Sequence, residues 1–253
     1  MIVSSPREAI AMGAVAFGSP HVLGAGEPNP AIVLSSVRRL ERGEALYSEG
    51  EAAVAPYLVL EGVMRVLVTS AAGQVRLADL AGPGDMLATA VFEGRPHGES
   101  VVAAHSAKVA QVDLGATLLR PAGRIGVGVT LGRQVKRSRE LADDLGLPMG
   151  ARICRILARL ARRLGRACDG ACELGVARAK GVGQQAARAE WRRLPFSLTH
   201  DDVALMAGCA RVTATRVLGE LKAAGALVGH RGDYALVPSA LDAAADEYVY
   251  EAI

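Results

Sequence analysis

The spacing of the apolar residues changes near residue 125 of this 253-residue chain, and that change limits the folds open to it. Before this point, short β-like runs alternate with glycine turns about every ten residues. After it, apolar residues recur at helical spacing. We therefore expect an α+β protein whose first half is an antiparallel β-barrel or sandwich. The runs expected to form strands are 57–60, 63–68, 75–80, 100–104 and 108–113.

A narrow apolar stripe follows this change. Its members recur at spacings of 4, 3, 4 and 3 residues, the a/d pattern of a coiled-coil seam: Leu131, Val135, Ser138, Ala142 and Leu145. A single amphipathic helix packed on the β domain would also produce such a period. Because the stripe is narrow and partly made of small side chains, a seam between two copies of the chain is favoured. Gly146 and Pro148 are expected to end the helix.

The stretch 197–222 has the pattern of two short helices joined by a glycine turn. Thr199 and Asp202 form a near capping box that opens the first helix, and Gly208 ends it. A second helix after a short turn makes this a helix-turn-helix. Its inward side chains are expected to be Val212, Val217, Leu218 and Leu221, and its outward ones Arg211, Thr213, Thr215 and Arg216.

The second helix and the segment after it are suited to DNA. A recognition helix presents its N-terminal residues to base edges, and a guanidinium pairs with guanine O6 and N7 at once. Arg211 and Arg216 are placed for this role. Residues 226–237 are expected to form a β-hairpin, the wing of a winged helix, with His230 and Arg231 near its tip to contact phosphates.

The charges are divided unevenly along the chain. Residues 1–150 carry 14 Lys and Arg against 15 Asp and Glu, residues 151–232 carry 15 against 6, and residues 233–253 carry none against 5. The middle block, at +9, has the charge of a module that binds a polyanion. A solvated basic face would give the same count. The last segment is expected to form an acidic helix.

Several functional classes lack their sequence signals. No run of about 18 apolar residues predicts a membrane span, and an N-terminus without a basic region, interrupted by Glu8, predicts a cytoplasmic protein without a signal peptide. Of the four cysteines only Cys168 and Cys172 are close in sequence, and two thiolates do not complete a zinc site. We expect no metal, no other cofactor and no enzyme, since no nucleophile–base pair or phosphate loop has an adequate context.

Residues 36–238 resemble the catabolite activator/FNR (CRP/FNR) family of bacterial transcription regulators. In the first half, Arg42-Gly43-Glu44, Glu49-Gly50-Glu51, 57–62 and Gly82-Pro83-Gly84-Asp85 are similar to the family's turns and to a strand that runs into a glycine. In the second half, 208–213 resembles the family's turn and recognition helix. The stretch 211–221 is similar to the recognition helix of the cyanobacterial nitrogen regulator.

The resemblance implies a cyclic-nucleotide-binding-like antiparallel β-barrel (a double-stranded β-helix), a long dimerisation helix and a C-terminal winged helix-turn-helix. It implies that Arg211 and Arg216 read bases. It also implies that Thr199, Thr213 and His200 bind phosphate, and further DNA contacts are expected from Thr215 and Arg231. A glutamate often follows the first arginine in the family, and here Val212 stands in its place. The half-site is therefore expected to differ from the family's usual one.

The sensor half departs from the family's cyclic-AMP pattern. Counting from Gly84-Asp85, the Gly-Glu pair for the ribose falls on Ala88 and Thr89, and the Arg-Ser pair for the phosphate on Glu99 and Ser100. A carboxylate repels a phosphate and offers it no donor, so cyclic AMP is not expected to bind. Arg137 and Ser138 stand where adenine would be met, and Arg133 could match one arginine of an oxoglutarate site. A different small effector and no effector both stay open.

These features divide the chain into an N-terminal extension (1–34), a β-barrel sensor domain (35–123), a dimerisation helix (124–146), a winged-helix DNA-binding domain (147–238) and an acidic C-terminal helix (239–253). We expect a transcription regulator, an activator that acts with RNA polymerase. It would bind an inverted repeat in double-stranded DNA as a homodimer, without cyclic-AMP dependence. The alternative is an effector-sensing module that binds another protein and whose winged helix does not read DNA.

Overall fold

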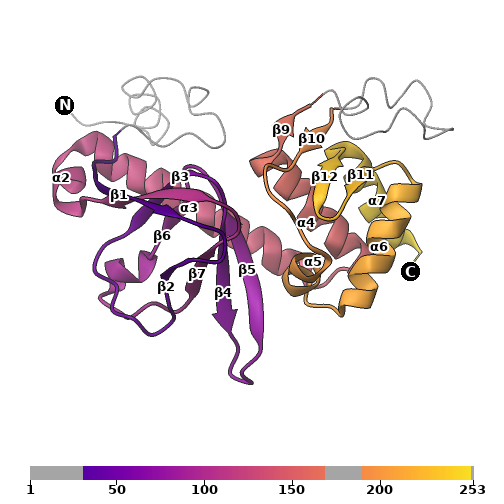
Figure 1. The fold of residues 1–253 in the computed structure, drawn as a ribbon, viewed down its shortest axis with the longest axis horizontal. Coiled ribbons are helices and arrows are strands. Elements are labelled where there is room, and N and C mark those ends of the chain that lie inside the picture. Colours follow the sequence, from indigo (N-terminus) through magenta and orange to yellow (C-terminus); the bar gives the residue numbers. More distant parts are fainter. Residues whose placement is uncertain (1–30, 169–189, 252–253) are drawn as a thin grey trace, which may run out of the picture.

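The computed structural model describes residues 31–168 and 190–251. Most of the expected N-terminal extension, and most of the Gly/Ala/Arg-rich segment before Trp191, therefore lie outside the described residues. The described chain forms a β-rich part and a mostly helical part, connected by the long helix α3 (Pro121–Asp144) (Figure 1). Within these residues, no helix combines the length and the apolar character that crossing a membrane requires.

The β-rich part consists of two four-stranded antiparallel sheets. The strands are β1 (Leu34–Leu40), β2 (Ala45–Tyr47), β3 (Tyr57–Glu61), β4 (Met64–Thr69), β5 (Val75–Ala81), β6 (Met86–Leu87), β7 (Ser100–Ala103) and β8 (Ala107–Val112). All five predicted strands are confirmed. Their order is β1-β8-β3-β6 in one sheet and β2-β7-β4-β5 in the other.

The two sheets are not closed into one barrel, because no strand pairing among the described residues joins them. The predicted antiparallel barrel or sandwich is therefore present as two facing sheets that share one core. Short strands with one buried face suit either arrangement, so their sequence pattern does not separate the two. Side chains from both sheets fill one core, among them the fully buried Val59, Met64, Val101 and Val109.

Helix α3 begins at Pro121, three residues before the expected start, and ends at Asp144. A short helix, α2 (Leu114–Leu119), precedes it. Gly123 allows the two to approach closely, since a Cβ at this position would lie 2.0 Å from the carbonyl oxygen of Thr117. One side of α3 packs on the β-rich part, where Val127 and Thr130 are buried.

The C-terminal part confirms the winged helix-turn-helix. Its helices are α4 (Met149–Leu164), α5 (His200–Ala207), α6 (Arg211–Ala223) and α7 (Pro238–Tyr250). Its strands, β9 (Arg166–Ala167), β10 (Arg192–Arg193), β11 (Leu227–His230) and β12 (Asp233–Leu236), form one sheet in the order β11-β12-β10-β9. Gly208, with φ of +68°, ends α5 as the sequence predicts, because glycine adopts this left-handed conformation readily.

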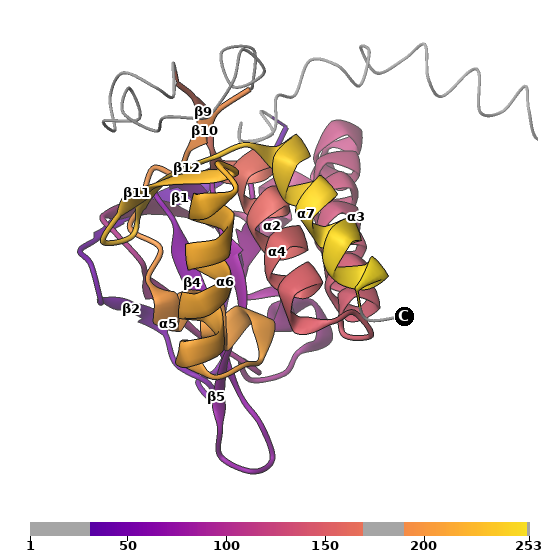
Figure 2. The same ribbon diagram turned by 90° about the vertical axis from the view of Figure 1, so that its right-hand side faces the viewer.

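The acidic helix α7 lies along the arginine-rich helix α4 (Figure 2). Leu241 and Ala245 of α7 are buried in the same apolar cluster as the inner face of α4. Asp246 pairs with Arg155 at 2.7 Å, and Asp242 pairs with Arg162. The negative charge of the C-terminal segment therefore compensates basic side chains of the mostly helical part.

The two parts are joined by apolar packing and by ion pairs. Leu77 and Leu80 of β5 belong to the buried cluster of the helical part. Arg163 of α4 donates two hydrogen bonds to Asp79 of β5, at 2.9 and 3.2 Å. Burial by itself would raise the pKa of Asp79, but the charge and hydrogen bonds of Arg163 outweigh it and lower that pKa. Asp79 is therefore ionised and holds α4 against the β-rich part.

Candidate nucleic-acid interface

The first helix of the helix-turn-helix starts with a complete capping box. The Thr199 hydroxyl accepts a hydrogen bond from the backbone N–H of Asp202 and donates one to the Asp202 carboxylate, at 3.0 and 2.8 Å. The backbone N–H of Thr199 donates to the same carboxylate at 3.0 Å. Since the only hydroxyl hydrogen of Thr199 is used in this cap, the geometry argues against the phosphate contact expected of it.

His200 connects three elements of the DNA-binding part. Its Nδ1 lies 2.9 Å from Oγ1 of Thr215 on α6, and its Nε2 lies 3.0 Å from the hydroxyl of Tyr234 on β12. Burial lowers the pKa of His200, and the charges of Lys222 and Arg211 lower it further, so the ring is neutral at pH 7. Both ring nitrogens are engaged. The geometry therefore assigns His200 to positioning α6 against the wing rather than to a phosphate.

Helix α6 buries one side and exposes the other. Ala214, Val217, Leu218 and Leu221 are buried, whereas Arg211, Thr215 and Arg216 are exposed and Thr213 is half-buried. The prediction that Val212 faces inward is wrong, because its side chain is 80% exposed. The error came from equating apolar character with burial: Leu221 is nine residues further on, about 180° around the helix.

The two arginines of this face form ion pairs that leave them accessible. Arg211 Nε lies 3.5 Å from Asp201, and the side chain is 69% exposed. Arg216 donates to Glu220 at 2.6 Å and is 60% exposed. Glu220 also accepts a hydrogen bond from the Tyr248 hydroxyl of α7, which lowers the pKa of Glu220 together with Arg216. Exposed pairs of this kind contribute about 0–1 kcal/mol, so DNA can compete for both guanidinium groups.

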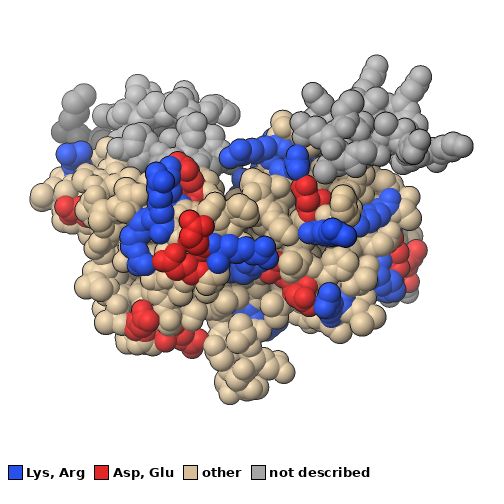
Figure 3. Space-filling model, in the orientation of Figure 1, with Lys and Arg blue, Asp and Glu red and all other residues tan. Residues whose placement is uncertain are grey.

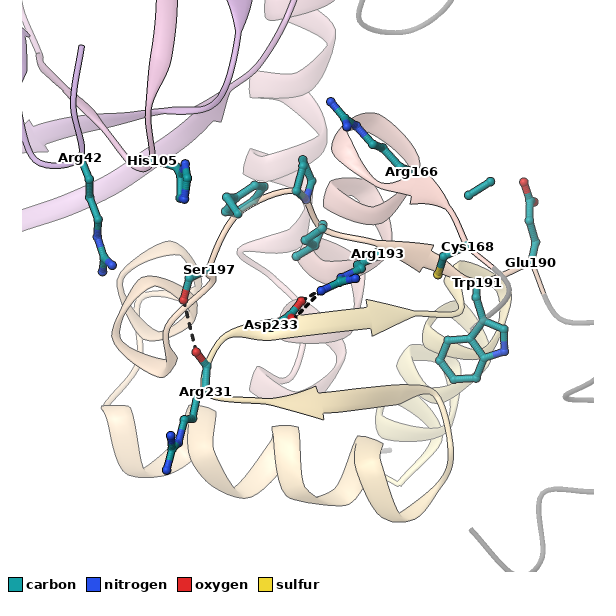
Figure 4. A pocket seen from close by; sticks show the side chains of 14 residues that line it. Arg42, His105, Arg166, Cys168, Glu190, Trp191, Arg193, Ser197, Arg231 and Asp233 are labelled. Carbon is teal, nitrogen blue, oxygen red and sulfur yellow. Dashed lines mark hydrogen bonds and ion pairs between the residues drawn. The ribbon is translucent and has the colours of Figure 1, made fainter. Parts of the chain in front are cut away.

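The wing is the hairpin of β11 and β12, as the sequence predicts. Its two-residue turn consists of Arg231 and Gly232, with φ of +52° and +87°. Such turns require positive φ at both positions, which glycine tolerates and arginine adopts rarely. The Ser197 hydroxyl donates to the carbonyl of Arg231 at 3.3 Å. Figure 4 shows the exposed Arg231 side chain extending away from the pair of Arg193 and Asp233.

A hollow of about 840 Å³ lies between the wing and the β-rich part (Figure 4). Arg42 and His105 line it from the β-rich part, and Arg166, Arg193 and Arg231 line it from the DNA-binding part. On the face of the molecule that Figure 3 shows, Lys and Arg form several groups with Asp and Glu between them. The basic block of the sequence therefore does not form one uninterrupted positive surface on this face.

A second cavity, of about 750 Å³, lies between the β-rich part and α3. Ala88, Thr89, Glu99, Arg137 and Ser138 line it, as expected of an effector pocket. The expectation fails for Ser100 and Arg133, which do not line the cavity. The Ser100 hydroxyl accepts a hydrogen bond from the backbone of Glu49, and Arg133 lies exposed on α3.

Tyr47, a buried residue that the sequence analysis missed, contacts two residues of the cavity lining. Its hydroxyl donates to the Glu99 carboxylate and accepts from the backbone N–H of Ala88, both at 2.9 Å. Burial raises the pKa of Tyr47, and the charge of Glu99 adds to the effect. Nothing in the sequence marks this pairing, because Tyr47 and Glu99 are 52 residues apart. Arg137, on the α3 side, donates to Asp85 at 2.6 Å and lies 3.3 Å from Asp79.

Most residues of the predicted seam of α3 are exposed, and Val135, Ser138 and Ala142 border the second cavity. Val135 and Leu145 are 51% and 56% exposed, and Ser138 and Ala142 are exposed as well. Leu131 differs from the expectation, since it is half-buried against the cluster of Ile32, Leu58 and Met86. Ile125 and Val129, toward the start of the helix, are also exposed, but Val129 lies about 120° around the helix from Val135 and does not continue the stripe.

The described residues contain no group of three or more His, Cys, Asp or Glu side chains that could hold a metal ion. Cys172 lies outside the described residues. Burial raises the pKa of the Cys154 thiol to about 12 and also raises that of Cys209. Both thiols are therefore protonated and unreactive at neutral pH.

Two family models match the chain. The model of the cyclic nucleotide-binding domain matches residues 37–118, and that of the Crp-like helix-turn-helix domain matches residues 151–241. The chain belongs to the CRP/FNR family of transcription regulators. Both parts of a CRP/FNR regulator, the sensor domain and the helix-turn-helix domain, are thus present in the order that the fold shows.

Solved structures of CRP/FNR regulators share this fold. A CRP-family regulator from Thermus thermophilus is 22% identical, with a TM-score of 0.64 over 84% of this chain and 98% of its own. FixK2 from Bradyrhizobium japonicum is 17% identical, with a TM-score of 0.65 over 85% and 98%. The c-di-GMP responsive regulator CLP from Xanthomonas campestris is 21% identical, with a TM-score of 0.58 over 80% and 93%. Among curated proteins no relative matches in sequence.

Proposed function

We propose that this CRP/FNR regulator binds a specific inverted repeat in double-stranded DNA as a homodimer. The observation that carries the proposal is the outer face of α6. Arg211, Thr215 and Arg216 are exposed there, at or near the N-terminal end of the second helix of a helix-turn-helix. A helix of this kind enters the major groove with its N-terminal residues at the base edges. Arg231 at the wing tip is proposed to contact a phosphate.

The homodimer part of the proposal rests on the exposed stripe of α3. Val135, Ala142 and Leu145 keep the spacing of a coiled-coil seam, and Val135 and Leu145 lie exposed. Gly128 and Gly132 are on the same helix, and a Cβ added to either would meet nothing within 4 Å. An exposed glycine inside a helix destabilises it by roughly 1 kcal/mol relative to alanine. The close packing of α3 from a second copy of the chain across Gly128 and Gly132 explains why glycine stands at these positions.

The test is selection of bound sites from a library of random DNA duplexes with the full chain. We expect an inverted repeat whose half-sites lie about 10 base pairs apart, one turn of DNA, as a two-fold dimer requires. The affinity for the selected site should fall steeply as salt is raised. Enrichment of a single half-site would contradict the homodimer. No enrichment of any sequence would contradict DNA reading and favour a protein-binding module.

The activator role and the contact with RNA polymerase are proposed on the membership of the CRP/FNR family. The described residues carry the two domains that such a regulator needs, and their packing connects the sensor domain to the first helix of the helix-turn-helix.

We further propose that cyclic AMP does not control this regulator. Glu99 brings a carboxylate to the cavity, and the nearby backbone N–H of Ala88 is already bonded to Tyr47. Arg137 is engaged by Asp85 and Asp79. A phosphate at Glu99 would therefore meet a like charge, and the guanidinium of Arg137 is already paired. That the Xanthomonas relative responds to c-di-GMP is compatible with a different effector in this fold.

Calorimetry with cyclic AMP tests this proposal. We expect no saturable heat at micromolar concentrations, and an unchanged DNA affinity when cyclic AMP is added to the selected site. The matched control is Ser100→Ala, a neighbour of Glu99 that does not line the cavity and that should behave as wild type. Saturable micromolar binding to the wild-type chain would refute the proposal.

A further inference from the structure

Val212 is an apolar side chain in an unusual place. It is the second residue of α6, its side chain is 80% exposed, and it lies between Arg211 and Thr213 in sequence. A single exposed valine is ordinary on a protein surface. Its position on the helix that is proposed to enter the major groove makes it informative, because nothing in the packing of the domain uses this side chain.

Val212 lies on the centre line of the exposed face of α6. At about 100° per residue, the buried Val217 and Leu218 lie about 140° and 120° from it, on opposite sides of the helix. Val212 therefore points directly away from the core of the domain. Arg216, four residues further on, lies about 40° from it, and Gly219, seven residues further on, lies about 20° from it on the other side.

The same centre line permits a close approach to DNA. Gly219 is exposed, and a Cβ added to it would meet nothing within 4 Å. Because valine and glycine are small, side chains in the middle of the outward face of α6 protrude little. Arg211 lies to one side of this line. Residues on the centre line of a helix in the major groove face the base edges.

The chemistry of a valine isopropyl group selects one base. In the major groove only thymine presents an apolar group, its C5 methyl, whereas guanine, cytosine and adenine present donors and acceptors there. An isopropyl group cannot satisfy such donors and acceptors, and placing it over them would remove their water without replacing it. We infer that Val212 is a specificity-determining residue that packs on the C5 methyl of one thymine in each half-site. This inference rests on the proposed DNA-reading function.

Replacing thymine by uracil tests the inference, because uracil lacks only this methyl group. Each thymine of the selected site is replaced in turn, in both half-sites, and binding by the full chain is measured. At one position we expect the wild-type affinity to fall about fourfold per half-site, as for the loss of one buried methyl-sized group. The variant Val212→Ala should bind the thymine and uracil duplexes equally at that position.

Two further variants sharpen the test. Val54→Ala alters a valine that is 86% exposed in the sensor domain, and it should keep the wild-type sensitivity to uracil. Val212→Glu should shift the preferred base at that position from thymine to cytosine, because a carboxylate accepts a hydrogen bond from cytosine N4. Alanine and glutamate are good helix formers, so neither variant should unfold α6.

The outcomes separate the inference from the proposed function. If replacing one thymine by uracil weakens binding by the wild type but not by Val212→Ala, the inference and the proposed function are both supported. A wild-type chain that selects a site but is indifferent to uracil at every position overturns the role of Val212 alone, as does equal uracil sensitivity in wild type and Val212→Ala. A wild-type chain that selects no sequence overturns the proposed function and the role of Val212 together.

Discussion

Replacing Arg65 by alanine should destabilise the whole chain rather than one domain. Arg65 of β4 donates two hydrogen bonds to Asp202 of α5, both at 2.8 Å, and the side chains are 17% and 8% exposed. Asp202 is also the capping-box residue of the helix-turn-helix. Removing one partner of a buried pair leaves the other charge without compensation, so we expect the free energy of unfolding to fall by about 3 kcal/mol.

Urea unfolding measures this effect, with Arg38→Ala as the matched control. Arg38 lies in the same domain and faces Glu44 at 4.0 Å, with both side chains nearly half exposed, so its loss should change the free energy of unfolding by less than about 0.5 kcal/mol. Equal stabilities of Arg65→Ala and Arg38→Ala would show that the pair of Arg65 and Asp202 does not hold the two domains together.

Lowering the pH should reduce the difference in stability between the wild type and Arg65→Ala. Burial alone would raise the pKa of Asp202, but hydrogen bonds from Arg65 and Thr199 outweigh it and lower that pKa. A carboxyl group with a lowered pKa stabilises the fold above its ordinary pKa, and this contribution is lost as the pH falls through the lowered value. The difference in unfolding free energy between wild type and Arg65→Ala should therefore narrow as the pH falls below about 4, the ordinary pKa of an aspartate. A constant difference would contradict the role of the Asp202 charge.

Local patterns of the sequence predicted most of the fold. The five strands, the long helix, the two helices of the helix-turn-helix and the wing each depend on residues close together in the chain. Thr199, Asp202 and Gly208 are an example, since capping and a left-handed helix end are decided within about ten residues. Such patterns did not decide between a barrel and a sandwich, because both arrangements place the same side chains inside.

Contacts inside the folded chain bear on several of the predicted site residues. The family resemblance implies that Thr199 and His200 bind phosphate. Their hydrogen bonds are instead used inside the domain, by Asp202, Thr215 and Tyr234. Leu131 fits the heptad spacing, yet the β-rich part covers it. Spacing along a helix shows which residues share a face, but not what packs against that face.

The central claim is that α6 reads DNA through Arg211 and Arg216, and parallel site selection with wild type, Arg211→Ala and Arg216→Ala tests it most directly. Losing either arginine should weaken binding to the wild-type site by about 1–3 kcal/mol per contact and relax the preference at one base of each half-site. Arg231→Ala is the control, because a lost phosphate contact should weaken all sequences alike and reduce the salt dependence. If both α6 variants keep the wild-type base preference and lose only salt-dependent affinity, the arginines contact the DNA backbone and the claim is wrong.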